Sequence, residues 1–364
     1  MDVNDLVLRL INERLHEIFS GRSDRPSKEE IREHFHPALD QVLDDLHRKE
    51  SDFFNREIKK ASKGAKEFQM KSLKVRKASL KKLGFALRAL DDLTAYSELL
   101  NRRMVYFLRG WMDPSDHRQM PPLLGRKSEY FGGPMLKILL FLSMHARASS
   151  IAAEISHLVK GGYREGAQAR ARTLYELTIF LLILSTQEDA SQCELAGRYY
   201  MSNLGEIRAQ ERFIRNIPKG YREERDQTIS LAKQKWGADL FRPYGWAKPA
   251  LPQVNGQIRF SDLERAVEMG EHRHIYLEMN HAIHAGAANL INRTNFDMAT
   301  LNVVGPELDL YYASRVIKVA VHSLLLCTGE ANRVVSSLTG NPGASLYLAP
   351  LKYLESIVHS SLES

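Results

Sequence analysis

Two histidines stand three residues apart in an alanine-rich stretch, EMNHAIHAGAANL, at residues 278–290. An imidazole titrates near neutral pH and also binds metals, so His281 and His284 could act as acid, base or ligand. The alanines and the glycine around them have little side-chain bulk, which lets a neighbouring helix approach closely. The stretch therefore predicts either a functional centre or a tight seam between two helices.

One interpretation of the stretch 278–290 is a metal site. Di-iron helical bundles use the spacing Glu-x-x-His to project a carboxylate and an imidazole inward. The spacing occurs at Glu13/His16, Glu33/His36, Glu154/His157, Glu271/His274 and Glu278/His281. The pairs at 154/157 and 278/281 fall on helices expected in a bundle. The His-Glu-x-x-His motif of zinc peptidases is absent from the sequence. We expect no metal and no cofactor, and interpret the pairs as parts of amphipathic helices.

Other enzyme classes and compartments are also disfavoured. The sequence has no Gly-x-Ser-x-Gly elbow, P-loop or Gly-x-Gly-x-x-Gly fingerprint. Cys193 and Cys327 lie far apart and outside any Cys-x-x-Cys pair, which indicates a reducing, cytoplasmic location. The N-terminus lacks a cleavable apolar block, and the longest apolar runs, 135–144 and 177–185, are shorter than the roughly 20 residues that span a bilayer. We expect a soluble protein with no membrane partner.

Positive charge is concentrated in one segment. The net charge of the chain is +7, whereas residues 55–90 carry twelve Lys or Arg against Glu57 and Glu67, a local charge of +10. A helix with so few carboxylates can contact many phosphates with salt-sensitive, sequence-independent affinity. We predict that it binds nucleic acid; the alternative is the solvated face of a coiled-coil-like helix. The predicted contact residues are Lys59, Lys60, Lys63, Lys66, Lys71, Lys74, Arg76, Lys77, Lys81 and Lys82.

Helical periodicity dominates the elements that position these residues, and no convincing strand hairpin is visible. Residues 4–20 predict an amphipathic helix, and Ser27 with Glu30 forms a capping box before the next helix. Residues 38–111 contain no proline and predict either one very long helix or two helices folded back on each other. The helices predicted beyond residue 134 are 135–160, 163–187, 190–216, 220–236, 261–269, 271–293, 307–338 and 343–362.

Two irregular stretches interrupt the helices. Residues 112–134 hold four prolines and three glycines. They predict a linker between an elongated N-terminal helical region, 1–111, and a C-terminal helical bundle, 135–364. Residues 237–258 predict an ordered surface segment or lid. We interpret the aromatic residues there and just before it, Trp236, Tyr244 and Trp246, as a hydrophobic plug rather than as base-stacking residues. The expected fold class is all-α.

Two segments together resemble a known family. The first, ASSIAAEISHLVKGGYREGAQARARTLYELTIFLLILS at 148–185, carries Arg-x-x-x-Glu. The second, HIYLEMNHAIHAGAANL at 274–290, carries Tyr-x-x-x-Asn-x-x-x-His. Their order is similar to that of an uncharacterised bacterial all-helical family, a domain of unknown function, over roughly residues 135–295. The resemblance implies no activity. The matching positions are Arg172, Glu176, Tyr276, Asn280 and His284.

These positions suit one polar cluster. Arg172 and Glu176 share a helix face, as do Tyr276, Asn280 and His284 on their own helix. We favour a structural seam in which these side chains satisfy one another's hydrogen bonds. The alternatives are a pocket in which His284 acts as acid or base beside Glu176, and a metal site. If the cluster is a structural seam or an acid–base pocket, His284 should lie within reach of Glu176 or Arg172.

A weaker likeness is to HEPN-type helical ribonucleases, which cut RNA with an Arg-x(4–6)-His motif. The His can act as acid or base while the Arg stabilises the phosphorane charge. No arginine precedes His284 at that spacing. Pairs elsewhere in the chain that fit it include Arg9/His16 and Arg315/His322. If the protein is an enzyme, a metal-independent ribonuclease is the first expectation.

Charge and resemblance together predict a bacterial helical protein that binds or acts on nucleic acid, as an effector in stress response or phage defence. The competing prediction is a non-enzymatic interaction module with a structural polar seam. Such a module would bind a partner protein or a second copy of itself through the N-terminal helices.

Overall fold

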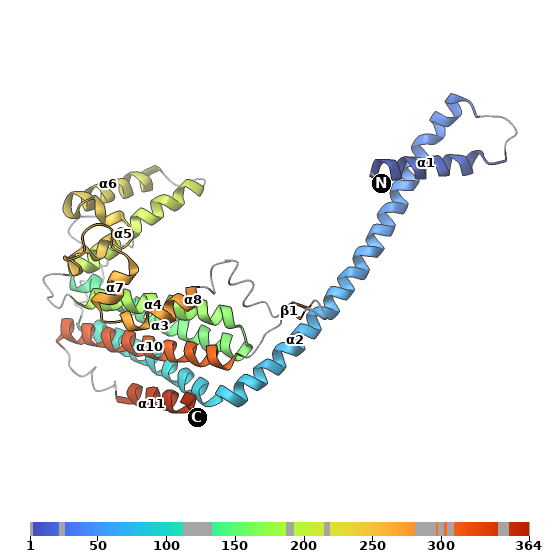
Figure 1. Ribbon diagram of the computed structural model, residues 1–364. Coiled ribbons are helices and arrows are strands. Elements are labelled where there is room, and N and C mark those ends of the chain that lie inside the picture. Colours follow the sequence, from blue (N-terminus) through green and yellow to red (C-terminus); the bar gives the residue numbers. More distant parts are fainter. Residues whose placement is uncertain are drawn as a thin grey trace. The chain divides into compact units, whose positions relative to one another are not determined.

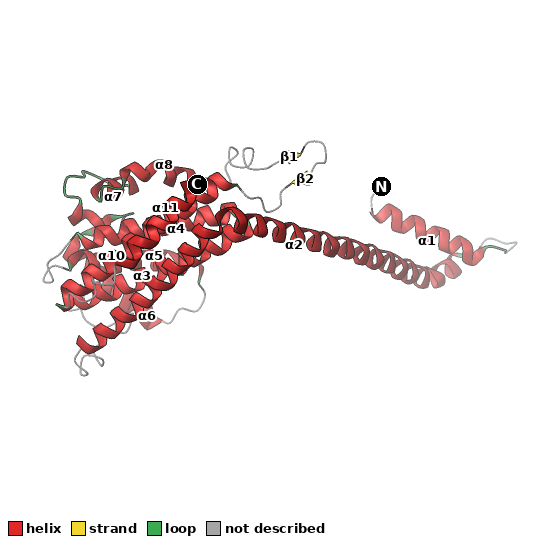
Figure 2. Ribbon diagram, turned by 90° about the horizontal axis from the view of Figure 1, so that it is seen from below, coloured by secondary structure: helices red, strands yellow, loops and turns green. Residues whose placement is uncertain are grey.

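A computed structural model describes residues 3–21, 26–111, 133–186, 193–214, 219–280, 296–297, 302–303, 309–340 and 349–363. Within these residues the fold is helical apart from one antiparallel pair of two-residue strands, β1 (Phe296–Asp297) and β2 (Asn302–Val303) (Figures 1 and 2). The all-α prediction is confirmed. The chain divides into two compact units, Met1–Lys71 and Ser72–Ser364.

The first unit contains α1 (Val3–Phe19) and the beginning of α2 (Lys28–Trp111). Side-chain contacts join these helices. The Phe19 and His34 rings stack with centroids 5.4 Å apart, and Arg14 Nε donates to the Gln41 side chain over 3.3 Å. The unit is therefore a pair of helices that pack along each other.

A capping box begins α2, as the sequence predicted. The Ser27 hydroxyl accepts from the Glu30 N–H over 3.3 Å, and the Glu30 carboxylate accepts from the Ser27 N–H over 2.8 Å. The N–H groups of the first turn of a helix have no partner within the helix, so this exchange stabilises its start.

The long segment after the capping box is one continuous helix, not a hairpin. Gly64 and Gly84 lie inside α2 without ending it. A helical glycine costs only about 1 kcal/mol relative to alanine, which surrounding helix-forming residues can offset. Residues 72–111 of α2 belong to the second unit. The structure thus divides the chain before the predicted linker, because this part of α2 carries the core residues Leu83 to Leu108.

Four helices build the centre of the second unit. Residues 72–111 of α2 are joined there by α3 (Pro134–Gly161), α4 (Arg164–Ser185) and α10 (Leu310–Thr339). Leu90, Ile151, Ile179 and Leu324, one from each helix, are completely buried in one hydrophobic core. Each such side chain stabilises the fold by roughly 1.5–3 kcal/mol. The unit is a helical bundle.

One polar network crosses this core. His145 on α3 is fully buried, with Nδ1 3.2 Å from Oδ1 of Asn101 and Nε2 3.0 Å from Oγ1 of Thr328. The Thr328 hydroxyl lies 3.1 Å from that of Ser97. Burial lowers the pKa of His145 to about 4, so the ring is neutral at physiological pH. The network thereby joins α2, α3 and α10 without a buried charge.

Shorter helices surround this centre, and η denotes a 3₁₀ helix. They are α5 (Glu194–Gln210), η4 (Glu211–Phe213), α6 (Lys219–Trp236), η5 (Ala238–Phe241), η6 (Gly245–Ala250), α7 (Phe260–Ala266), η7 (Gly270–His272), α8 (Arg273–Asn280) and α11 (Ala349–Glu363). The helix predicted over 271–293 is described as far as Asn280, and residues 281–295 lie outside the described part of the chain.

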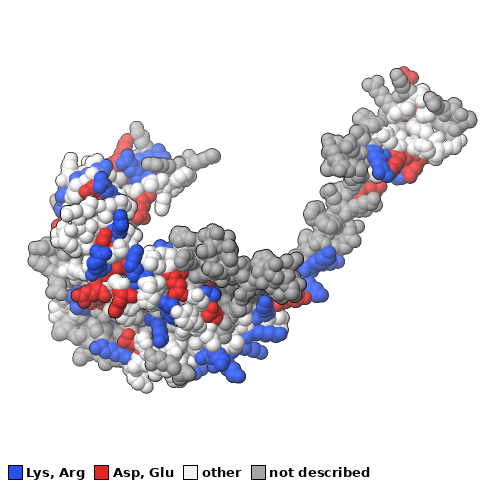
Figure 3. All heavy atoms as spheres, in the orientation of Figure 1, with Lys and Arg blue, Asp and Glu red and all other residues white. Residues whose placement is uncertain are grey.

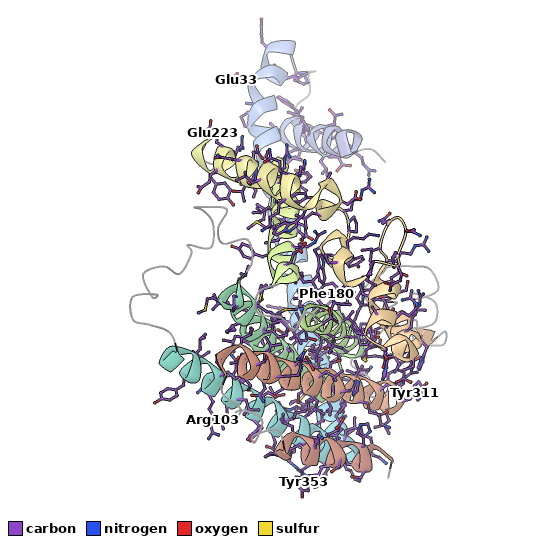
Figure 4. All side chains as sticks on the ribbon, turned by 90° about the vertical axis from the view of Figure 1, so that its left-hand side faces the viewer. Glu33, Arg103, Phe180, Glu223, Tyr311 and Tyr353 are labelled. Carbon is purple, nitrogen blue, oxygen red and sulfur yellow. The ribbon has the colours of Figure 1, made fainter. Side chains whose placement is uncertain are left out.

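The segment predicted as an aromatic plug is packed into the bundle. Trp246 is 4% exposed, and its ring lies 4.9 Å from that of Tyr199 and 5.7 Å from that of Phe180. Figure 4 shows Phe180 among the helices of the bundle. A Cβ on Gly245 would lie 1.8 Å from the carbonyl oxygen of Asp239, so only glycine fits this turn. The interpretation of Trp246 as part of a plug is confirmed.

Two core helices, α3 and α10, are long and apolar enough by length and composition to cross a membrane. The prediction from uninterrupted apolar runs did not anticipate this. The finding is weak evidence for a membrane span, because buried core helices of soluble proteins pass the same test.

Candidate functional site

Arg172, Glu176 and Tyr276 meet in one hydrogen-bonded triad, which we call the polar triad. Nη2 of Arg172 lies 2.8 Å from Oε1 of Glu176, one turn later on α4. The Tyr276 hydroxyl on α8 donates to the same Oε1 over 2.9 Å and accepts from Arg172 Nη2 over 3.2 Å. The structure therefore brings together three of the five residues that the resemblance singled out.

Aromatic rings support the triad. Phe260 on α7 stacks on Tyr276 with ring centroids 4.7 Å apart, and the Arg172 guanidinium carbon lies 5.2 Å from the centre of the Tyr276 ring. The Tyr175 ring lies 5.7 Å from that of Tyr276. These contacts fix the Tyr276 ring on several sides and thereby orient its hydroxyl.

A buried carboxylate lies behind these rings, and sequence reasoning missed it. Glu264 is buried; it accepts from the Tyr175 hydroxyl over 3.1 Å and forms an ion pair with Arg273. Tyr175 directly precedes Glu176, but its partner Glu264 is 89 residues away in the chain. The spacing of residues within one helix cannot predict a contact between residues so far apart in the chain.

The surroundings of Tyr276 and Arg172 keep both groups in their ordinary charge states. Burial raises the pKa of Tyr276 to about 12, and the hydrogen bond to Glu176 adds to this against the opposing effect of Arg172. Burial alone would lower the pKa of Arg172, but Tyr276 and Glu176 outweigh it and the net shift is upward. At neutral pH the phenol is therefore neutral and the guanidinium charged, so Tyr276 can donate a proton in a hydrogen bond but cannot serve as a base.

Two of the five residues that the resemblance singled out each have one buried atom without a partner among the described residues. The atoms are Nε of Arg172 and Oδ1 of Asn280, which follows Tyr276 by one turn of α8. Asn280 thus does not join the triad through an observed bond. The predicted acid or base, His284, lies within residues 281–295 and so outside the described part of the chain. The triad that is described has each charged head paired, the arrangement expected of a structural seam.

The Arg315/His322 pair does not form a free Arg–His site. Arg315 on α10 forms an ion pair with Glu278 on α8 over 2.7 Å. His322 stacks on His272 with ring centroids 5.2 Å apart, and burial together with His272 lowers the pKa of His322. Both side chains are used in packing α10 against α8 and η7.

The carboxylates of the bundle's Glu-x-x-His pairs are likewise occupied. Glu154 pairs with Arg147 over 3.2 Å and with Arg170 over 2.8 Å, while Glu278 pairs with Arg315. Among the residues that the structure describes, no group of three or more His, Cys, Asp or Glu could hold a metal ion.

The predicted nucleic-acid-binding residues are all exposed on α2. Lys59, Lys60, Lys63, Lys66 and Lys71 lie in the first unit, and Lys74, Arg76, Lys77, Lys81 and Lys82 in the second. The prediction omitted Arg88, which is exposed, and Phe85, which is 60% exposed. A signal for Phe85 exists in the sequence, because it lies off the apolar positions Leu83 and Leu87 that face the core.

Comparison with known proteins gives one result. Residues 139–299 match a family of unknown function, DUF5677. This match confirms the predicted resemblance to an uncharacterised family; it does not show the likeness to HEPN-type ribonucleases. It covers α4 and α8 with the polar triad, and not the basic residues of α2. Neither the curated proteins nor the solved structures gave a match.

Proposed function

We propose that the protein binds nucleic acid through the cationic part of α2 that belongs to the second unit, Ser72–Leu90, which we call the basic segment. The observation that carries this proposal is a run of unbalanced charge. The basic segment holds six Lys or Arg and no Asp or Glu. They are Lys74, Arg76, Lys77, Lys81, Lys82 and Arg88, all exposed.

None of these six cations takes part in an ion pair within the described residues, whereas Arg147, Arg170 and Arg315 elsewhere in the same unit do. Unpaired cations repel one another along a helix, which is unfavourable unless a polyanion or counterions balance them. Figure 3 shows Lys and Arg side chains gathered along this part of α2. The basic segment therefore presents a surface that suits phosphates.

The spacing of these cations lets several act together. Lys74, Lys77, Lys81 and Arg88 are separated by three, four and seven residues, which places them on one side of the helix. Each cation that neutralises a phosphate releases condensed counterions, so the affinity should fall steeply with salt and depend little on sequence. Binding of this kind needs no catalytic group.

The polar triad supports a binding protein over a nuclease. Its carboxylate, guanidinium and phenol are engaged with one another, so none of the three is left to attack or protonate a phosphodiester. A structural seam on α4 and α8 and a cationic surface on α2 together account for both features. A role in stress response or phage defence, and assembly through the N-terminal helices, stay predictions.

Salt-dependent binding tests the proposal. Fluorescence anisotropy with labelled RNA and DNA should show binding at low salt that weakens as salt rises. The variant Lys74→Glu/Lys77→Glu/Lys81→Glu should lower the affinity at least tenfold at low salt and flatten the slope of log K against log salt by about three. The variant Arg222→Glu/Lys233→Glu/Lys352→Glu has the same net charge, alters exposed residues of α6 and α11, and should bind nearly as the native protein does. Equal loss in both variants, or no binding by the native protein, would refute the proposal.

A further inference from the structure

A groove runs between α2 and α11 beside the basic segment. It has a volume of about 480 Å³, within the range of roughly 300–1,000 Å³ typical of ligand sites. Its lining includes Lys81, Lys82, Phe85 and Arg88 from α2, and Ile357 and Ser360 from α11. Both helices belong to the second unit, where Leu351 and Val358 anchor α11 in the core. The groove therefore combines cations with apolar and hydroxyl groups on packed helices.

Phe85 is the unusual residue of this groove. Its side chain is 60% exposed although Leu83 and Leu87, on the adjacent face of α2, are buried. The Arg88 guanidinium carbon lies 5.6 Å from the centre of the Phe85 ring, so a cation flanks the aromatic ring. An aromatic ring held in a cationic groove has a face to offer a planar ligand.

Gly84 leaves room next to this ring. A Cβ built on Gly84 would meet no atom within 4 Å, although the residue lines the groove. Any larger side chain there would extend into space that is now open. A larger apolar side chain at Gly84 would therefore fill part of the groove without altering its charge.

We propose that this groove binds single-stranded nucleic acid, with an unpaired base stacked on Phe85 and adjoining phosphates neutralised by Lys81, Lys82 and Arg88. This inference rests on the proposed function and adds the class of nucleic acid. Cationic grooves with aromatic platforms bind single strands because every base has a stacking face. In a duplex the bases are stacked on one another, so a duplex can meet the lysines but not the ring of Phe85.

An anionic membrane is the competing partner, because α2 also exposes Leu73 and Leu80 among its lysines. A groove favours the single strand: a base can enter a recess of this size, whereas a bilayer surface would meet only its rim. Vesicle binding is accordingly included in the test.

The test compares Phe85→Ala with Phe85→Trp in the full-length protein. Stacking on an aromatic residue is worth about 1–3 kcal/mol per base, so Phe85→Ala should weaken binding to oligothymidylate or oligouridylate about tenfold. Binding to a duplex of mixed sequence should not change, and Phe85→Trp should keep the native affinity for the single strands. Because Phe85 is largely exposed, the melting temperature of each variant should stay near that of the native protein. Comparing the two homopolymers shows whether DNA or RNA is preferred.

Substitutions of Gly84 provide a second test of the same inference. Gly84→Leu should weaken single-strand binding as Phe85→Ala does, whereas Gly84→Ala adds only a Cβ and should leave it unchanged. The inference is overturned if Phe85→Ala affects single strand and duplex alike or neither. It is also overturned if phosphatidylserine vesicles bind through Phe85 while single strands do not. If the inference is overturned but the protein still binds a duplex through Lys74 and Lys77, the proposed function remains supported. If the protein binds no nucleic acid at all, both the proposed function and this inference are wrong.

Discussion

The hydroxyl of Tyr276 lies 2.9 Å from Oε1 of Glu176, a residue one hundred positions earlier in the chain. The same oxygen accepts from Arg172 over 2.8 Å, so one carboxylate oxygen joins α4 to α8 through two donors. Since each charged group has its counterpart, the contact connects two helices without leaving a buried charge unpaired. The consequences for stability can be measured.

Tyr276→Phe should lower the free energy of unfolding by about 1–2 kcal/mol, because a hydrogen bond to a carboxylate is lost while the ring keeps its packing. Urea denaturation followed by circular dichroism measures the change. Tyr353→Phe removes a hydroxyl from a residue that is 67% exposed, seen at the surface in Figure 4, and should change stability little. If both variants are as stable as the native protein, the triad is not a stabilising seam.

Gly245→Ala should destabilise the second unit by at least about 2 kcal/mol, because the added Cβ would overlap the Asp239 carbonyl and displace the turn. Gly84→Ala makes the same chemical change at an open helical position. It should stabilise the protein by about 0.5–1 kcal/mol through helix propensity. Thermal unfolding of the two variants should thus move in opposite directions, and a shift of the same sign in both would contradict the packing around Gly245.

His145 should make the protein less stable in mild acid. Its folded-state pKa of about 4 lies below the ordinary value of 6.5, so the unfolded chain takes up the proton first as the pH falls. The contribution is zero above pH 6.5 and becomes unfavourable between 6.5 and 4, reaching about 2 kcal/mol at pH 5. Unfolding measured at pH 7 and pH 5 should show this loss, and His145→Gln should reduce it. An equal pH dependence in the variant would show that other groups cause it.

The purified protein should contain no stoichiometric iron, manganese or zinc. The carboxylates of Glu154 and Glu278, which belong to the Glu-x-x-His pairs of the bundle, already form ion pairs with arginines. Elemental analysis after dialysis against buffer with added Mn²⁺, Fe²⁺ or Zn²⁺ provides the measurement. One or two equivalents of a retained metal would contradict the expectation and point to residues beyond those described.

Much of the helical pattern follows from local sequence. The sequence alone predicted the Ser27/Glu30 capping box, the helix that carries Arg172 and Glu176, and the aromatic plug around Trp246. The physical reason is that capping and the spacing of side chains on one helix face involve residues at most four positions apart. Side chains that share a face do so whatever the helix later packs against.

The tertiary structure decided how those faces meet. Only packing makes residues 72–111 of α2 part of the bundle core, although the linker signal lies after residue 111. Only packing joins Tyr175 to Glu264, and places α11 beside Phe85 to form a groove. Such pairings depend on the summed burial of many apolar side chains over long stretches of chain, and no short spacing in the sequence encodes that sum. The sequence by itself thus determined the helices and their charged faces, while the packing of the core decided which of those faces became a closed seam and which an open groove.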